Sequence, residues 1–127
     1  YNKEMSDIAG DAQYDAATAI WGGDWRMPTN AELQELFDNC TWTWTTQNGV
    51  NGYKVTSKVN SNYIFLPAAG YRDGSSLYNA GSGGLYWSSA PYGNYDSGAC
   101  YLYFRSYIHY MYDTYRNNGL SVRPVVE

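Results

Sequence analysis

The sequence of 127 residues has little basic charge and no long apolar segment. Its eight lysines and arginines are scattered and its net charge is −4, whereas binding to a nucleic-acid backbone needs clustered cations. We therefore expect no nucleic-acid partner. No run approaches the roughly eighteen apolar residues of a membrane span, and no basic start followed by an apolar core marks a signal peptide. Because the chain opens at Tyr1 without methionine, we interpret it as a mature product or an excised domain, with any export signal outside it.

Cysteine and histidine are too sparse to indicate a catalytic or metal site. Cys40 and Cys100 show neither metal-ligand spacing nor a Cys-x-x-Cys pair, so they are either unpaired or form one disulfide. His109 is the only histidine, and in a strand it would face the side opposite to Ser106, which argues against a catalytic triad. We predict no enzymatic activity, no metal and no cofactor.

The first part of the chain contains two helix signals. The alanine-rich segment Ala12–Ile20 is followed by two glycines, which stop a helix. A second helix begins at Thr29, where Thr29 and Glu32 have the spacing of a capping box, and it should end near Asn39. At this length the chain is expected to form a single domain over residues 1–127.

Beyond Asn39 the pattern changes to alternation, which is typical of strands. The Asn-Gly pairs at 48–49 and 51–52 predict a hairpin between the first two strands. The predicted strands are Thr41–Thr45, Tyr53–Thr56, Tyr63–Leu66, Leu85–Ser88, Tyr101–Arg105, Ile108–Tyr112 and Ser121–Val126. Segments 73–76 and 81–84 are predicted as loops. Helices followed by short strands indicate an α+β domain built on an antiparallel sheet.

The C-terminal third is crowded with tyrosine. Eight of the fifteen tyrosines lie between Tyr92 and Asn117. Read as one strand, the segment 101–109 buries Leu102, Phe104, Ser106 and Ile108 and exposes Tyr101, Tyr103, Arg105, Tyr107 and His109. Tyrosine gives a large amphipathic contact area with few torsions to freeze. We therefore predict a binding surface here, although any one of these tyrosines could instead pack in the core.

Five motifs carry a resemblance to a known family. They are Trp21-Gly22-Gly23-Asp24-Trp25-Arg26-Met27-Pro28-Thr29, then Glu32-Leu33 with Leu36, then Phe65 to Arg72, then Leu85-Tyr86-Trp87-Ser88-Ser89, and Ser121-Val122-Arg123-Pro124-Val125. In this order they resemble the Fibrobacter succinogenes major paralogous domain. The resemblance implies a C-type-lectin-like fold of the version shared with formylglycine-generating enzymes. It would have two helices packed on a small twisted antiparallel sheet, with long loops and adjacent termini.

The segment of about 90–118 further resembles the variable region of proteins diversified by diversity-generating retroelements. In such systems adenines are randomised, chiefly in asparagine codons, which cannot then encode Lys, Glu, Gln, Trp or Met. From Ala90 to Asn118 there is no Lys, Glu, Gln or Trp, although these types supply fifteen residues elsewhere. The single methionine of this segment, Met111, falls in the apolar set expected to be fixed.

The resemblance implies a non-enzymatic domain that binds an unknown protein or glycan through side chains that vary between clones. The expected ligand-binding residues are Tyr92, Asn94, Tyr95, Asp96, Tyr101, Tyr103, Arg105, Tyr107, His109, Tyr110, Tyr112, Asp113, Tyr115 and Asn117. We expect display on a bacterial cell surface, secretion, or a place on a phage particle. The five tryptophans are assigned to segments that match the family scaffold, and we expect them in the core.

Two alternatives stay open. One is an undiversified carbohydrate-binding or adhesin module, with tryptophans as a sugar platform. The other is a relative of the formylglycine-generating enzymes that uses Cys40 or Cys100, although no local cysteine motif matches theirs.

Overall fold

The computed structural model describes residues 7–91, 98–115 and 118–126. Strands take up 52% of it and helices 14%. The elements, in chain order, are α1 (Ala16–Trp21), β1 (Trp25–Arg26), α2 (Asn30–Asn39), β2 (Cys40–Gln47), β3 (Val50–Ser57), β4 (Tyr63–Pro67), β5 (Tyr71–Asp73), β6 (Ser76–Tyr78), β7 (Gly83–Pro91), β8 (Gly98–Arg105), β9 (Ile108–Tyr115) and β10 (Val125–Val126).

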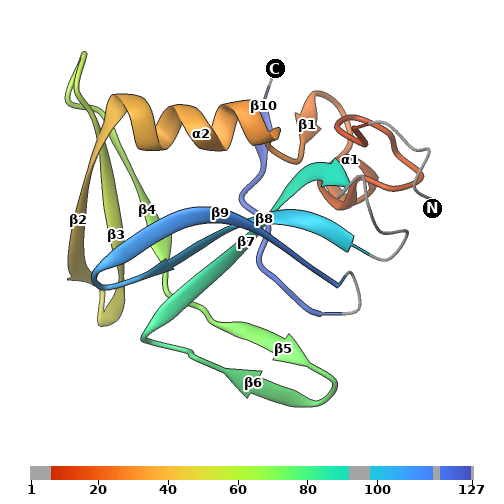
Figure 1. Cartoon of the computed structure of the whole chain (residues 1–127). Coiled ribbons are helices and arrows are strands. Elements are labelled where there is room, and N and C mark those ends of the chain that lie inside the picture. The colour runs from red at the N-terminus through yellow and green to blue at the C-terminus, as the bar shows by residue number, and fades with distance from the viewer. Residues whose placement is uncertain (1–6, 92–97, 116–117, 127) are drawn as a thin grey trace.

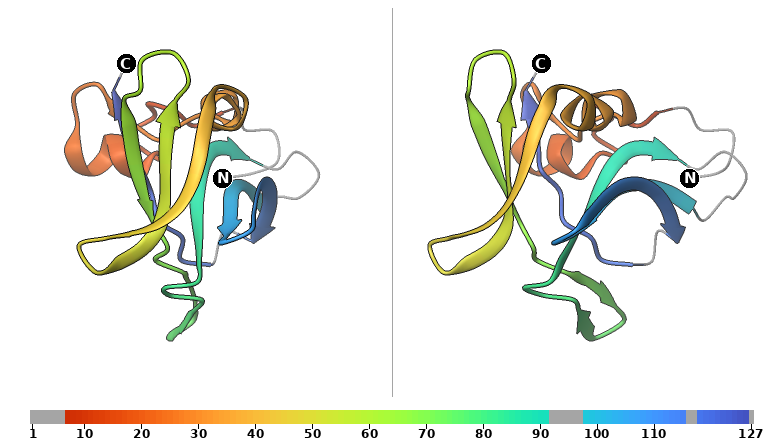
Figure 2. Two further views of the ribbon diagram at one scale, coloured as in Figure 1. Left: turned by 90° about the vertical axis from the view of Figure 1, so that its left-hand side faces the viewer. Right: turned by 60° about the vertical axis from the view of Figure 1, so that its left-hand side comes forward.

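These strands form four small antiparallel sheets in the described part of the chain. Two have three strands, in the orders β2-β3-β4 and β7-β8-β9, and the pairs β5-β6 and β1-β10 form the others. Figure 1 shows α2 crossing above the two larger sheets, with the β5-β6 hairpin projecting below them. The turned views of Figure 2 show the same two sheets next to each other, with α2 near one end of both.

The predicted α+β fold, with two helices packed on one sheet, is wrong. The chain is mostly β, and among the described residues only α2 has seven or more residues. Asp15 caps α1 and Gly22 ends it, so the segment before Asp15 forms turns where a helix was expected. The short α1 packs beside β1, and α2 is the helix that contacts the larger sheets. The C-type-lectin-like arrangement implied by the resemblance therefore does not describe this fold.

The second helix and the first hairpin confirm the local sequence signals. The Thr29 hydroxyl accepts from the Glu32 amide, and the Glu32 carboxylate accepts from the Thr29 amide, which completes the capping box. Asn48 and Gly49 have φ of 52° and 80°, the left-handed conformations that a two-residue hairpin turn requires. The second Asn-Gly pair lies inside β3 instead of a turn.

Two other segments differ from expectation. The predicted strand Ser121–Val126 is reduced to β10 and an isolated bridge at Ser121. The predicted loop around 73–76 closes a hairpin, because Asp73 pairs with Ser76 across the turn. The bridge at Ser121 depends on Tyr86, far away in the chain, whereas the 73–76 pairing arises within the segment itself.

The core lies where the inner faces of the two larger sheets meet below α2. Leu102 and Phe104 of β8 are fully buried. The Phe104 ring contacts Tyr53 at 5.3 Å and Tyr86 at 6.0 Å between centroids. The remaining buried members of the cluster are Leu33, Val55, Leu66 and Ala68. Burying aromatic rings against both sheets is therefore what holds the β7-β8-β9 sheet in place.

Candidate binding face

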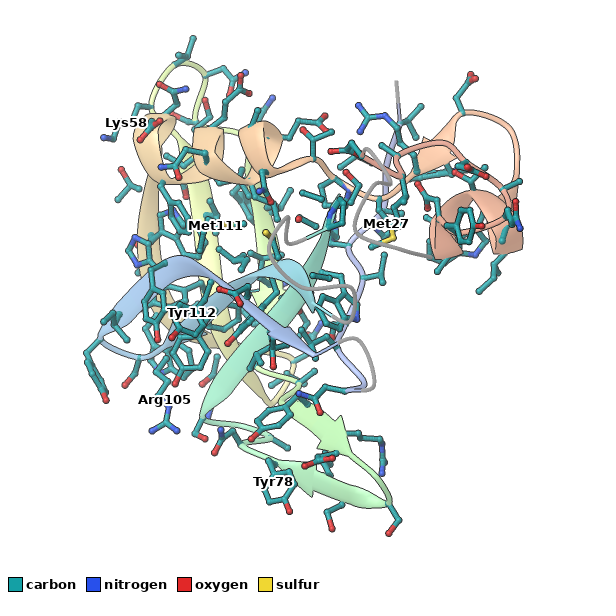
Figure 3. All side chains as sticks on the ribbon, turned by 45° about the vertical axis from the view of Figure 1, so that its right-hand side comes forward. Met27, Lys58, Tyr78, Arg105, Met111 and Tyr112 are labelled. Atoms are coloured by element: carbon teal, nitrogen blue, oxygen red, sulfur yellow. The ribbon has the colours of Figure 1, made fainter. Side chains whose placement is uncertain are left out.

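The β8-β9 hairpin gathers four tyrosines on its outer side. Its register pairs Tyr101 with Tyr112 and Tyr103 with Tyr110. Because strand neighbours point to opposite faces, the residues between them point to the core. Figure 3 shows Met111 on the opposite side of β9 from Tyr112. We call Tyr101, Tyr103, Tyr110 and Tyr112 the tyrosine face.

The rings of the tyrosine face touch in a continuous series. Tyr101 and Tyr112 are 6.2 Å apart, Tyr112 and Tyr110 5.9 Å, and Tyr110 and Tyr103 5.1 Å, measured between ring centroids. Trp87 of β7 extends the series, at 6.3 Å from Tyr101. Most of these contacts are edge-to-face, an arrangement that stabilises aromatic pairs beyond the area they bury. The face is therefore ordered before any ligand arrives.

Exposure differs sharply between members of the face. Tyr101 is buried, whereas Tyr110 is 39% and Tyr112 58% exposed. Burial, reinforced by the neighbouring tyrosines, raises the pKa of Tyr101 to about 12. Tyr101 thus supports the face from below and stays neutral, and Tyr110 and Tyr112 offer their rings to solvent.

Arg105 lies at the end of β8, on the same side as the tyrosine face (Figure 3). The side chains of Tyr103 and Tyr107 raise its pKa further, through charge interaction and hydrogen bonding. Among the described residues the ion pair is Arg26 with Glu32, so no described carboxylate neutralises Arg105. Its Nε is shielded from solvent and has no hydrogen-bond acceptor in that part of the chain. The edge of the face therefore carries an unneutralised positive charge.

The turn between β8 and β9 extends the exposed aromatic area. Tyr107 is 78% exposed and lies in the two-residue turn that joins the strands. It interacts with the Arg105 side chain. The exposed part of this site thus combines three tyrosine rings, from Tyr107, Tyr110 and Tyr112, with one cation.

His109 does not belong to this surface, which corrects the sequence-based expectation. The turn at 106–107 ends the alternation, and His109 pairs with Phe104 on the inner face. Its ring stacks on Trp42 at 4.4 Å and 3° and on Phe37 at 5.1 Å. Burial lowers the pKa of His109. A histidine stacked inside the aromatic core is a packing residue.

The other expected ligand residues are distributed as follows. Asp113 is half-buried and shares the inner side of β9 with Met111. Tyr115 is the last residue of β9. The remaining expected residues lie outside the described part of the chain: Tyr92, Asn94, Tyr95, Asp96 and Asn117.

Two of the five tryptophans contradict the expectation that all pack in the core. Trp42 and Trp44 pack against the core cluster, and Trp87 is half-buried. Trp21 is 56% and Trp25 43% exposed. The sequence contained a signal for this exposure, the Gly22-Gly23 pair between the two tryptophans. A glycine turn lies at the surface and brings its flanking residues there.

The cysteines and the described acidic residues are both of types that can ligate metals. Cys40 and Cys100 are both free thiols. In the described ranges no three His, Cys, Asp or Glu side chains are grouped so that they could hold a metal ion. None of the helices there has the length and apolar character needed to cross a membrane.

The fold and this surface define a mostly β domain with an ordered, exposed tyrosine face. The chain belongs to the family described as a domain of unknown function, DUF8237, whose model matches residues 33–125. No curated protein and no solved structure gives a significant match.

Proposed function

We propose that this chain is a non-enzymatic binding domain that holds a protein or glycan ligand on the tyrosine face and the adjoining turn. The observation that carries the proposal is the series of ring contacts at 5.1 to 6.2 Å, whose two central members, Tyr110 and Tyr112, are exposed. Tyrosine and arginine are the types enriched at binding hot spots. The buried tyrosines Tyr53 and Tyr86 direct their hydroxyls to backbone carbonyls instead.

The binding mechanism is complementarity to a preorganised aromatic surface. Rings that already touch lose little freedom when a ligand covers them, which lowers the entropic cost of association. Arg105 would then donate a charge-assisted hydrogen bond to a carboxylate or another anionic group of the ligand. The phenol hydroxyls can donate or accept hydrogen bonds.

We also propose, from the resemblance to retroelement-diversified proteins, that the outward side chains are varied by adenine-directed mutagenesis. The separation of the two sides of the hairpin supports this. Changes at Tyr110 or Tyr112 alter the ligand surface without touching the core, whereas Leu102 and Phe104 fill it. Met111, which randomised asparagine codons cannot encode, is on the inner side. Such a domain would act on the bacterial surface, outside the cell, or on a phage particle.

DNA sequencing around the gene tests the diversification. We expect a near-copy of the segment encoding 90–118 close to a reverse-transcriptase gene, with differences confined to template adenines. The differing codons should encode Tyr103, Arg105, Tyr107, Tyr110 and Tyr112. Absence of such a copy, or differences that fall equally on Leu102 and Phe104, would refute diversification and leave the binding face to be tested separately.

Two matched libraries test the binding face itself. One randomises four residues on the outer side of the hairpin, Tyr103, Arg105, Tyr110 and Tyr112. The other randomises four residues on its inner side, Leu102, Phe104, His109 and Met111. Both are displayed on phage and scored for protease resistance, then for binding to immobilised streptavidin as a fixed test protein. The outer library should keep resistance and yield binders. Equal loss of resistance in both libraries would contradict the proposal.

Alanine scanning of a selected binder completes the test. Tyr112→Ala should weaken binding by about tenfold or more, as truncation of a hot-spot aromatic does. Tyr63 of β4 is a matched control, because its exposure of 54% is close to the 58% of Tyr112 and it lies on the other large sheet. Equal effects of the two substitutions would show that the tyrosine face is not the binding surface.

A further inference from the structure

A second aromatic surface lies away from the tyrosine face. Trp21, at the end of α1, and Trp25, at the start of β1, meet edge to face with centroids 6.1 Å apart and planes at 62°. With Pro124 they line a hollow of about 360 Å³. We call these three residues the tryptophan corner. Figure 1 shows α1 and β1 at the opposite end of the molecule from the β8-β9 turn.

The backbone holds the two tryptophans close to each other. Gly22 and Gly23 have φ of 65° and 58°, a left-handed turn that other residues adopt only with strain. The Trp25 amide donates to the Gly22 carbonyl, and the Thr18 hydroxyl donates to the Trp25 carbonyl at 2.9 Å. Pairing of β1 with β10 holds the other side of Trp25. The rings are therefore preorganised without being packed in the core.

The size of the corner favours a small ligand over a protein surface. Small-ligand sites commonly measure roughly 300 to 1,000 Å³, and the hollow of about 360 Å³ is at the lower end of that range. A stable protein interface covers about 800 Å² on each partner, which three residues cannot provide. The corner fits one or two rings of a ligand.

The chemistry of the corner matches a sugar ring. The indole faces are flat and apolar, and neither indole N–H is engaged by a described residue, so both can donate to a ligand. Asp24 and Arg123, which precede Trp25 and Pro124 in the chain, are exposed polar residues. A pyranose combines an apolar C–H face with hydroxyl edges. The net charge of −4 disfavours a polyanionic ligand.

We propose that the tryptophan corner binds a neutral hexose unit of a glycan. One pyranose ring would pack against an indole face, and its hydroxyls would be directed to the indole N–H groups and to Asp24 and Arg123. This site is independent of the tyrosine face. It gives the domain two separate binding surfaces and assigns a function to the two tryptophans that the core does not use.

The test is titration of the purified chain with soluble glucose, mannose, galactose and N-acetylglucosamine tetrasaccharides, followed by tryptophan fluorescence and calorimetry. At least one probe should bind saturably. Trp21→Ala and Trp25→Ala should each weaken binding by about tenfold or more, and Trp25→Phe should weaken it less, because a smaller ring keeps part of the contact. Circular dichroism confirms that the variants fold.

Controls separate this proposal from the function of the tyrosine face. Tyr112→Ala and Tyr63→Ala should leave saccharide binding unchanged. Loss of binding with Tyr112→Ala alone would move the sugar site to the tyrosine face and overturn the assignment. No saturable binding of any probe would also overturn it. Sedimentation that shows self-association abolished by Trp21→Ala would identify a second copy of the chain as the occupant and contradict the sugar proposal.

Discussion

Removing the carboxylate of Asp15 should destabilise the domain far more than a typical acidic residue would. Asp15 is fully buried. One oxygen accepts from the amides of Ala17 and Thr18 at 2.9 and 3.1 Å, and the other accepts from Gly10 and Met27 at 2.8 and 2.9 Å. A single side chain therefore caps α1 and ties it to the segments on both sides.

The magnitude follows from these four bonds. Loss of an N-cap costs about 1 kcal/mol. Leaving buried amides such as those of Ala17 and Met27 without an acceptor costs about 1 to 3 kcal/mol more. We expect Asp15→Ala to lower the free energy of unfolding by about 3 kcal/mol, and Asp15→Asn, which keeps one oxygen, by less.

Urea unfolding followed by tryptophan fluorescence measures this loss. Asp11→Ala is the matched control, because Asp11 is exposed and its side chain accepts one amide hydrogen bond, from Gln13. We expect the control to stay within about 1 kcal/mol of the unsubstituted protein. Similar losses for Asp11→Ala and Asp15→Ala, both within that margin, would refute the role assigned to Asp15.

The pKa of Asp15 predicts how the stability of the domain changes at acid pH. Burial alone would raise the pKa of Asp15, but the four amide hydrogen bonds outweigh it and hold the pKa below the usual 3.8. Its stabilisation is therefore complete above pH 3.8 and is lost as the pH falls through the lower folded-state value. At neutral pH the Asp15→Asn variant should be less stable than the unsubstituted protein. Its free energy of unfolding should also fall less on acidification. An identical acid dependence in both proteins would contradict this.

The remaining predictions concern the core and two other titrating groups. Gly84→Ala should destabilise the fold by about 1 to 3 kcal/mol or more in urea unfolding, because its new methyl group would collide with the Phe104 ring; a neutral effect would contradict the packing. His109, whose pKa burial lowers from 6.5, should make stability fall as the pH drops below 6.5; His109→Phe should flatten this dependence, and an unchanged slope would refute it. The hydrogen bond with Arg26 is the main cause that lowers the pKa of Glu32 to about 2, from 4.5; its stabilisation should therefore be lost between pH 4.5 and about 2, and Glu32→Gln should remove that part of the acid transition.

Local signals in the sequence determined several elements of the fold. The capping box at Thr29 and Glu32 set the start of α2, and the Asn48-Gly49 pair set the first hairpin. The alternation around Leu102 and Phe104 identified a strand with one buried side. Each of these depends on residues a few positions apart, so the sequence contains all the information needed.

Tertiary contacts decided the rest. The alternation through His109 looked continuous, but the turn at 106–107 reversed the chain, and pairing with Phe104 turned His109 inward onto Trp42. The helix expected from alanine content was cut to six residues because the capping carboxylate of Asp15 also binds the amide of Met27, twelve residues away.

For the two candidate sites, the sequence predicted the location of one, and the tertiary structure decided which side chains are exposed. Tyrosine composition alone pointed to the β8-β9 segment, since a cluster of amphipathic rings indicates an interface wherever it folds. Composition could not separate buried Tyr101 from exposed Tyr112, or predict that Trp21 and Trp25 would reach solvent. Exposure depends on what packs across from a residue, and that partner is supplied by distant parts of the chain once it has folded.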